Sequence, residues 1–300
     1  MTLEAHVQAP SRNERVVAFI QLMKLRVVEL LLVSTLPALV LAYKGVPPIG
    51  VSIATLIGGT LAAGAANAYN MVIESDLDKL MTRTSNRPLV TGVISRKEAT
   101  VFATVVATIS LAIFWFFTTT LATLLALFAI AFYVLVYTVL LKPRTTQNIV
   151  WGGIAGCMPV LIGWAAITNS LSWTAVSFFL VIFFWTPPHF WSLAIKFRDD
   201  YQAAGFPMLP VVAPKSSVRL QMWFHTSAMI ISSVAVVLFA ELPLWTLLAT
   251  LALGFIFAFQ LLQLNDGAEN YSRVAGKIFQ WSISYLSLFS VLLVAGQLIS

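Results

Sequence analysis

Two long stretches of this chain contain no charged residue. No Asp, Glu, Lys or Arg lies between Glu98 and Lys142, and none lies between Arg144 and Lys196. Each stretch is long enough for two membrane-crossing helices of roughly 20 residues. Apolar runs of this length have no polar face, which argues against a soluble protein with a large core. The chain has 300 residues, 59% of them hydrophobic, and is predicted to be an all-α polytopic membrane protein.

The apolar segments predict about nine transmembrane helices in two pseudo-repeated halves. Their centres lie near Leu32, Gly59, Ser110, Ala131, Val160, Leu180, Ser232, Leu253 and Leu288. The long loops after the second and the sixth helix are both acidic near their start, and both contain bases. Membrane folds built from repeats place their site where the repeats meet, so we expect these two loops to face each other.

The basic residues indicate the orientation in the membrane. Of the 18 Lys and Arg, only Lys44 falls in the connections on the opposite side from the rest. The positive-inside rule then places the N-terminus in the cytoplasm and the C-terminus outside, in a bacterial cytoplasmic (inner) membrane. The same asymmetry explains most of the net charge of +6, which therefore does not predict nucleic-acid binding. Cys157 is the only cysteine, so the chain cannot form an internal disulfide.

A polar block follows the second apolar segment. Asn70, Glu74 and Asp78 fall at i, i+4 and i+8, so on a helix they share one face. An amide oxygen and two carboxylates suit Mg²⁺, which prefers one or two carboxylates together with phosphate oxygens and waters. Asp76 lies off this stripe and is a further candidate ligand. The alternative is a solvated helix end with capping acids, but acids crowded by bases at a membrane boundary favour a site.

Basic residues surround this stripe in the sequence. Arg83 and Arg87 follow at a distance that lets them fold back over an anion, and guanidinium groups bind phosphate oxygens in a bidentate manner. Lys142 and Arg144 fall on the same predicted side of the membrane and are candidates for the same anion. Their charge suits a role as membrane anchors equally well. The sequence thus predicts a site for a Mg²⁺-bound diphosphate.

A second polar block follows the sixth apolar segment. We expect Asp200 to complete a metal site opposite the first block, with Asp199 as a further candidate ligand. Lys196 and Arg198 are candidates for contacts with phosphate. Tyr201 is a candidate for stacking on the substrate or for a hydrogen bond to it.

Two features just before this second block suggest a cavity. Pro187-Pro188 predicts a bend or an interruption of the sixth helix, and interrupted helices occur in membranes where the backbone lines a cavity. His189 follows at membrane depth. It is either a hydrogen-bonded core residue or an axial ligand to a haem iron, because neutral imidazole is a common iron ligand.

These blocks together resemble the UbiA-like intramembrane prenyltransferases over nearly the whole chain. The matching segments are the Asp78 block ending Asn86-Arg87-Pro88-Leu89, the run Asn148-Ile-Val-Trp-Gly152-Gly153, and Pro188-His189-Phe190-Trp191 leading to Asp200-Tyr201. The Pro-His-Phe-Trp and Gly-Phe-Pro-Met-Leu-Pro segments resemble the haem branch of the family rather than the quinone branch. The family's first motif usually has Asp at the position that Glu74 occupies in this chain.

The resemblance implies nine helices around a central cavity, in a single intramembrane prenyltransferase domain at residues 23–300 after a cytoplasmic segment at residues 1–22. It implies a Mg²⁺-dependent diphosphate site at the cytoplasmic end, with four catalytic ligands: Asn70, Glu74, Asp78 and Asp200. The implied reaction transfers a farnesyl group from farnesyl diphosphate to a vinyl group of haem b (protoheme IX), with water addition giving haem O. Haem b is then a substrate, and haem A synthase or the terminal oxidase assembly is a candidate partner.

Two other functions stay open. Polyprenyl transfer to another aromatic or tetrapyrrole acceptor, such as 4-hydroxybenzoate or a chlorophyll precursor, would keep the metal site and change the acceptor pocket. A secondary transporter also uses repeats and interrupted helices. A transporter explains the sequence less well than a prenyltransferase does, because the charges of this chain lie in loops rather than at the bilayer midplane.

Overall fold

The computed structural model describes residues 11–265 and 270–299, with the backbone alone at residues 26–32. Every regular element in these ranges is a helix, and the first ten residues of the expected cytoplasmic segment lie outside them. The long helices are α2 (Leu25–Tyr43), α3 (Ile49–Asp78), α4 (Arg96–Phe117), α5 (Thr120–Ala131), α6 (Asn148–Thr168), α7 (Trp173–Lys196), α10 (Lys215–Phe239), α11 (Leu244–Leu262) and α12 (Tyr271–Leu298). The short ones are α1 (Arg12–Leu22), η1 (Thr82–Thr84), α8 (Arg198–Ala203) and α9 (Leu209–Val212).

Eight helices of the described chain are long and apolar enough to cross a membrane. They correspond to eight of the nine predicted segments. The remaining predicted segment, around Leu32, corresponds to α2. It falls outside this set because only the second half of α2, Val33–Tyr43, qualifies as an apolar helix among the described residues. The all-α polytopic membrane fold is thus confirmed, whereas the count of nine crossings stays a prediction.

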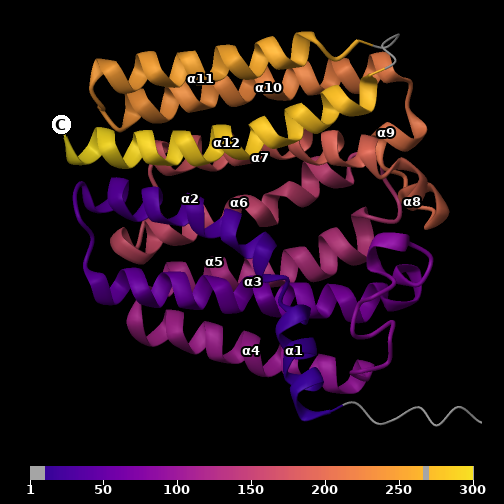
Figure 1. The fold of residues 1–300 in the computed structure, drawn as a ribbon. Coiled ribbons are helices and arrows are strands. Elements are labelled where there is room, and N and C mark those ends of the chain that lie inside the picture. Colours follow the sequence, from indigo (N-terminus) through magenta and orange to yellow (C-terminus); the bar gives the residue numbers. More distant parts are fainter. Residues whose placement is uncertain (1–10, 266–269, 300) are drawn as a thin grey trace, which may run out of the picture.

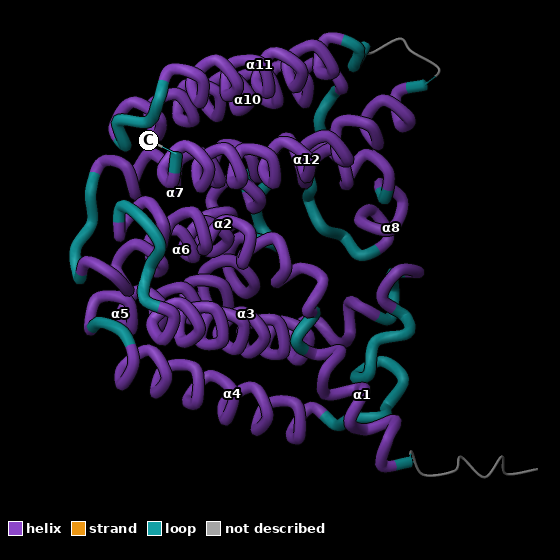
Figure 2. Tube along the Cα trace, turned by 60° about the vertical axis from the view of Figure 1, so that its left-hand side comes forward, coloured by secondary structure: helices purple, strands orange, loops and turns teal. Residues whose placement is uncertain are grey.

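The long helices form a closed ring (Figures 1 and 2). Each helix from α2 to α7 packs on the next, α7 packs on α10, and α10, α11 and α12 follow in order. The ring closes where α12 packs on α2. Contacts of α2 with α6, and of α7 with α12, hold the two sides together across the middle.

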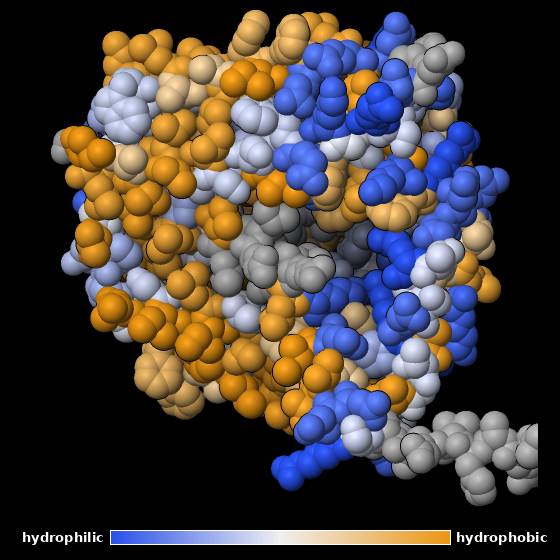
Figure 3. Space-filling view, in the orientation of Figure 1, coloured by the Kyte–Doolittle hydropathy of each residue, from blue (hydrophilic) through white to orange (hydrophobic). Residues whose placement is uncertain are grey.

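Hydrophilic side chains gather at one end of this bundle, on the face seen in Figure 3. This end holds α1, α8 and α9, and it also holds the end of α3 (Figure 1). The rest of the visible face is dominated by apolar side chains. The polar end is therefore the end at which the two predicted polar blocks meet.

Two local sequence signals set helix boundaries at this end. Ser11 and Ser95 cap α1 and α4, and in each case the glutamate three residues later returns a hydrogen bond to the cap backbone. This reciprocal capping box satisfies backbone N–H groups that have no partner within the helix. Pro187-Pro188 was predicted to bend or interrupt the sixth helix. The interruption is wrong, because α7 runs through both prolines without a break.

The fourth predicted membrane segment, centred near Ala131, contains a feature that the sequence did not suggest. After α5 the chain continues as a π-helix at Phe132–Leu141, in which the backbone hydrogen bonds reach back five residues. Lys142 N–H, for example, donates to the carbonyl of Tyr137 at 2.9 Å. Such π segments are rare and occur mostly at functional sites.

The contact between α2 and α6 depends on a glycine. A Cβ atom at Gly163 would lie 3.1 Å from the backbone oxygen of Thr35 and 3.3 Å from the Cβ of Ala38. Backbone cannot rotate away as a side chain can, so α2 and α6 can approach this closely only because residue 163 has no side chain. Gly156, on the same helix, has no atom within 4 Å of the corresponding position.

We expect Gly163→Ala to lower the thermal unfolding midpoint of the detergent-purified protein and Gly156→Ala to leave it unchanged or raise it. Both variants gain the same helix propensity, so their difference isolates the overpacking, which typically costs about 1–3 kcal/mol. Equal midpoints for the two variants would contradict the close contact of α2 with α6.

Candidate active site

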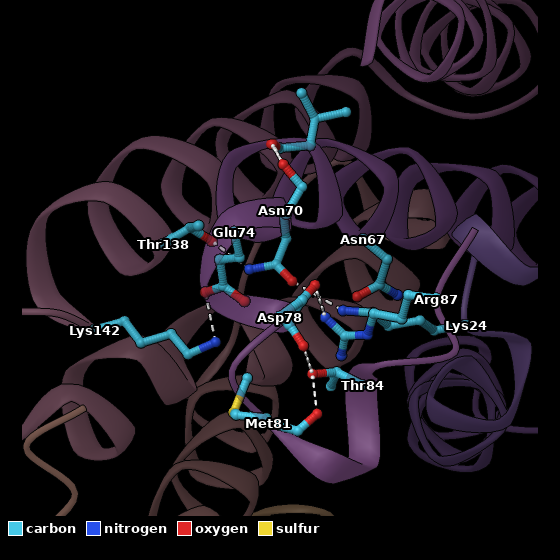
Figure 4. Close-up of polar contacts among 12 residues, drawn as sticks. Lys24, Asn67, Asn70, Glu74, Asp78, Met81, Thr84, Arg87, Thr138 and Lys142 are labelled. Atoms are coloured by element: carbon cyan, nitrogen blue, oxygen red, sulfur yellow. Dashed lines mark hydrogen bonds and ion pairs between the residues drawn. The ribbon is translucent and has the colours of Figure 1, made fainter. Parts of the chain in front are cut away.

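The last three turns of α3 carry a row of buried polar side chains. Asn67, Asn70, Glu74 and Asp78 are all at most 5% exposed. Their spacing of three and four residues keeps them along one side of the helix, and Figure 4 shows them facing the same cluster. Two carboxylates buried at the end of a membrane helix need partners, because an unpaired charge is strongly disfavoured there.

Each carboxylate is paired with a base from another segment. Lys142 Nζ lies 2.5 Å from Glu74 Oε1, and both side chains are buried. Arg87 Nη1 lies 2.5 Å from Asp78 Oδ2, and the Asp78 side chain is only 1% exposed. The two pairs connect α3 to the end of the π-helix and to the loop that follows α3 (Figure 4).

A third base contacts the amide of this row. Lys24 Nζ donates to Asn70 Oδ1 at 2.8 Å, and the backbone of Lys24 has the left-handed conformation, with φ of 50°. Burial lowers the pKa of the Lys24 ammonium to about 7, and the charge of Arg87 contributes in the same direction. An anion that enters the cluster would stabilise the protonated form of this side chain.

The π-helix faces α3 through three polar contacts. Tyr133 Oη donates to Asn67 Oδ1 at 3.3 Å, Asn70 Nδ2 donates to the Thr138 hydroxyl at 3.2 Å, and Lys142 pairs with Glu74. Positions 133 and 138 would lie about 140° apart around an α-helix of 3.6 residues per turn. The wider turn of the π-helix brings them to the same side.

The second polar block meets the first through Arg83. The backbone N–H of Arg83 donates to Asp200 Oδ2 at 3.4 Å, and the Arg83 guanidinium lies 4.8 Å from the ring centroid of the buried Tyr201. Burial raises the pKa of the Tyr201 hydroxyl, which keeps it a hydrogen-bond donor at neutral pH. The structure thus brings Asp200 and Tyr201 to the loop that carries Arg83 and Arg87.

Two candidate ligands lie apart from the buried row. The Asp76 side chain is 68% exposed and forms ion pairs with Lys79 and with Arg96. Asp199 is exposed at the start of α8. Asp76 points away from Glu74 and Asp78 because a two-residue step on a helix turns the side chain to the other face.

Three candidate phosphate-binding bases have other contacts in this structure. Arg144 donates to the carbonyls of Val139 and Leu140 at the end of the π-helix. Arg198 donates to the carbonyl of Val211. Lys196 Nζ lies 5.4 Å from the ring centroid of Phe197. All three bases are exposed, and their role in binding phosphate stays a prediction.

The side chain of His189, which belongs to α7, packs against α12. Its ring stacks on Trp185 and on Phe279, with centroid distances of 4.2 and 4.7 Å. Its Nδ1 lies 2.7 Å from the Ser282 hydroxyl. These contacts are those of a hydrogen-bonded core residue, one of the two roles considered for it, and the iron-ligand role stays a prediction.

The buried row suits a Mg²⁺ ion that shares its coordination with a diphosphate. Within the described chain, no three His, Cys, Asp or Glu side chains are grouped so that they could hold a metal alone. Mg²⁺ needs only one or two carboxylates when phosphate oxygens and waters supply the rest. Asp78 Oδ1 is buried and has no hydrogen-bond partner among the described residues, so it is an oxygen whose coordination is incomplete.

Comparison of the sequence with known protein families and proteins identifies the family of this chain. The model of the UbiA prenyltransferase family matches residues 31–283. The chain belongs to the UbiA prenyltransferase family. Among its relatives, a protoheme IX farnesyltransferase of Renibacterium salmoninarum is 47% identical over 279 residues, covering 92% of this chain and 88% of that protein. A protein of the same name from Leifsonia xyli is 46% identical over 293 residues, covering 96% and 95%.

Solved structures share the fold of this chain. A structure described as a digeranylgeranylglyceryl phosphate synthase superposes with a TM-score of 0.79 at 15% identity, covering 96% of this chain and 100% of that one. A UbiA homologue from Archaeoglobus fulgidus, bound to GPP and Mg²⁺, superposes with a TM-score of 0.67 at 17% identity, covering 93% and 99%.

Several residues of the cluster were not among the predicted site residues. Asn67 continues the stripe of Asn70, Glu74 and Asp78 one turn earlier, so the spacing could have indicated it. Lys24, Tyr133 and Thr138 had no such signal. Lys24 lies far from α3 in the sequence, and the other two reach the site only through the π-helix.

We expect Lys142→Met to lower the free energy of unfolding by about 3–5 kcal/mol, because it leaves the Glu74 charge buried without a partner. The double variant Glu74→Gln/Lys142→Met removes both charges and should regain most of this loss. Lys79→Met is the matched control, since its pair with Asp76 is exposed and such pairs contribute at most about 1 kcal/mol. Chemical unfolding in detergent measures all three, and equal losses for Lys142→Met and Lys79→Met would contradict the buried pair.

Proposed function

We propose that this protein transfers the farnesyl group of farnesyl diphosphate to a vinyl group of haem b. The observation that carries the proposal is the buried cluster at the end of α3, where two carboxylates and an amide lie beside three bases. Relatives at 46–47% identity over nine-tenths of the chain are called protoheme IX farnesyltransferase. The name supports haem as the acceptor, and the cluster supports a diphosphate as the leaving group.

Oxygen atoms of the cluster would hold Mg²⁺ together with the diphosphate. Asn70, Glu74 and Asp78 supply them from α3, and Asp200 supplies them from the second loop. Bound Mg²⁺ would neutralise part of the negative charge that develops on the departing diphosphate. Solved family members bound to GPP or DMAPP with Mg²⁺ support this assignment.

The bases of the cluster would bind the rest of the diphosphate. Arg87 and Lys142 are held beside the carboxylates in this structure, and each is placed to contact phosphate oxygens when a diphosphate lies between the acids. Lys24 approaches from the junction of α1 and α2, and Arg83 lies on the same loop as Arg87. Preorganised positive charges of this kind stabilise a leaving anion without the cost of reorienting water.

The chemistry needs a dry site. The C–O bond of the allylic diphosphate breaks with its electron pair on oxygen, and the π electrons of the vinyl group form the new C–C bond. Water would then add to the cation left beside the porphyrin and release a proton, which gives the hydroxyethylfarnesyl group of haem O. Exclusion of water from the buried row would protect the first cation from hydrolysis.

The polar end of the bundle would face the cytoplasm. The bases of the N-terminal segment and of the two long loops lie at this end, and the positive-inside rule places such residues in the cytoplasm. This arrangement supports a cytoplasmic N-terminus and an active site on the cytoplasmic side of a bacterial inner membrane. Association with haem A synthase or a terminal oxidase stays a prediction.

The direct test incubates the purified protein with haem b, farnesyl diphosphate and Mg²⁺ and identifies the products by mass. We expect haem O, its loss on chelation of Mg²⁺, and a decrease of at least about 100-fold in rate for Asp78→Asn. Asp76→Asn, which changes an exposed acid two residues away, serves as the matched control. Full activity of Asp78→Asn would contradict the assignment of the site.

The same assay distinguishes the other acceptors. When 4-hydroxybenzoate replaces haem b, we expect no prenylated product. Prenylation of 4-hydroxybenzoate with haem b left unchanged would assign the protein to the quinone branch while keeping the metal site. Movement of a solute across a sealed vesicle without Mg²⁺ and without any product would instead indicate a transporter.

A further inference from the structure

Thr138 makes a hydrogen bond that differs from the usual one of a threonine in an α-helix. The hydroxyls of Thr55, Thr60 and Thr100 donate to the carbonyl four residues earlier, as is usual in an α-helix. Thr138 instead donates to the carbonyl of Tyr133, five residues earlier, at 2.9 Å. This bond exists because the backbone at Phe132–Leu141 is a π-helix.

The direction of this hydrogen bond determines the direction of the bond between Thr138 and Asn70. The Tyr133 carbonyl can only accept, so the single hydrogen of the Thr138 hydroxyl is used there. The hydroxyl oxygen is left as an acceptor, and it accepts from Asn70 Nδ2 at 3.2 Å. Asn70 and Thr138 are 2% and 4% exposed, so water has little access to compete for these groups.

The orientation of the Asn70 amide follows from its two ends. Its NH₂ group faces Thr138, and its Oδ1 faces Lys24, whose ammonium can only donate. Only the oxygen of an amide is a ligand for Mg²⁺. A flipped amide would direct its NH₂ hydrogens toward the cation and remove one ligand from the site.

We propose that Thr138 is a positioning residue that holds the Asn70 amide with its oxygen toward the metal side of the site. The inference rests on the proposed function of the cluster. Lys24 holds the same orientation in the structure, but a bound diphosphate attracts its ammonium. Thr138 then remains as the contact that keeps the amide from flipping.

This role also gives the π-helix a function. In an α-helix the Thr138 hydroxyl would donate to the carbonyl of residue 134, and position 138 would turn away from the side that carries Tyr133. The π-helix keeps Tyr133, Thr138 and Lys142 opposite Asn67, Asn70 and Glu74. The register of this membrane segment against α3 is therefore part of the site.

The test measures Mg²⁺-dependent binding of inorganic diphosphate to the detergent-purified protein by calorimetry, without turnover. We expect Thr138→Val to weaken binding roughly five- to tenfold, the effect of losing one buried hydrogen bond. Thr138→Ser keeps the hydroxyl and should bind within about twofold of the parent protein. Thr55→Val, a buried threonine on α3 without contact to the cluster, should leave binding unchanged. In turnover assays Thr138→Val should need a higher Mg²⁺ concentration for half-maximal rate.

Two results separate the possible failures. Parent-like binding by Thr138→Val, together with lost binding by Asp78→Asn, would overturn the role of Thr138 and leave the metal site standing. Parent-like binding by Asp78→Asn would overturn the proposed site itself. Thr138→Ala removes the same hydroxyl with less bulk, and it replaces Thr138→Val in the comparison if the valine variant unfolds at a lower temperature than Thr55→Val.

Discussion

The pairing of buried charges at the end of α3 determines how the segments around the site are arranged. Glu74 and Asp78 lie at the end of a membrane helix with almost no exposure, and a charge in that position persists only with a partner. The partners come from different places: Lys142 from the end of the π-helix and Arg87 from the loop after α3. Each pair therefore fixes one segment against α3, and together they hold the walls of the site.

The charge balance of the cluster suits the proposed substrate. With Asp200 and Arg83 included, three carboxylates face four bases when Lys24 is protonated, which leaves one net positive charge. A prenyl diphosphate that is fully ionised and bound to one Mg²⁺ carries one net negative charge. Binding would thus bring the buried site close to neutrality, which is the state that a low-dielectric environment favours. Burial lowers the pKa of Lys24 to about 7, and a bound anion would favour its protonated form.

Features that depend on the local spacing of residues could be predicted from the sequence. Features that depend on contacts between distant segments could not. The stripe of Asn70, Glu74 and Asp78 follows from helical periodicity, and the membrane segments follow from the charge-free runs. The π-helix does not, because apolar residues all around a membrane helix give no periodic signal from which its register can be read. Pro187-Pro188 was expected to bend or interrupt a helix, yet α7, which packs against α6, α10 and α12, is continuous through both prolines.

The most direct measurement is the anomalous scattering of Mn²⁺ in crystals of the protein with a non-hydrolysable farnesyl thiodiphosphate. The account predicts a manganese peak in contact with Asp78 and the Asn70 oxygen, with Arg87 and Lys142 directed toward the diphosphate oxygens. A peak elsewhere in the bundle, with the Glu74–Lys142 and Asp78–Arg87 pairs intact beside the bound ligand, would contradict it.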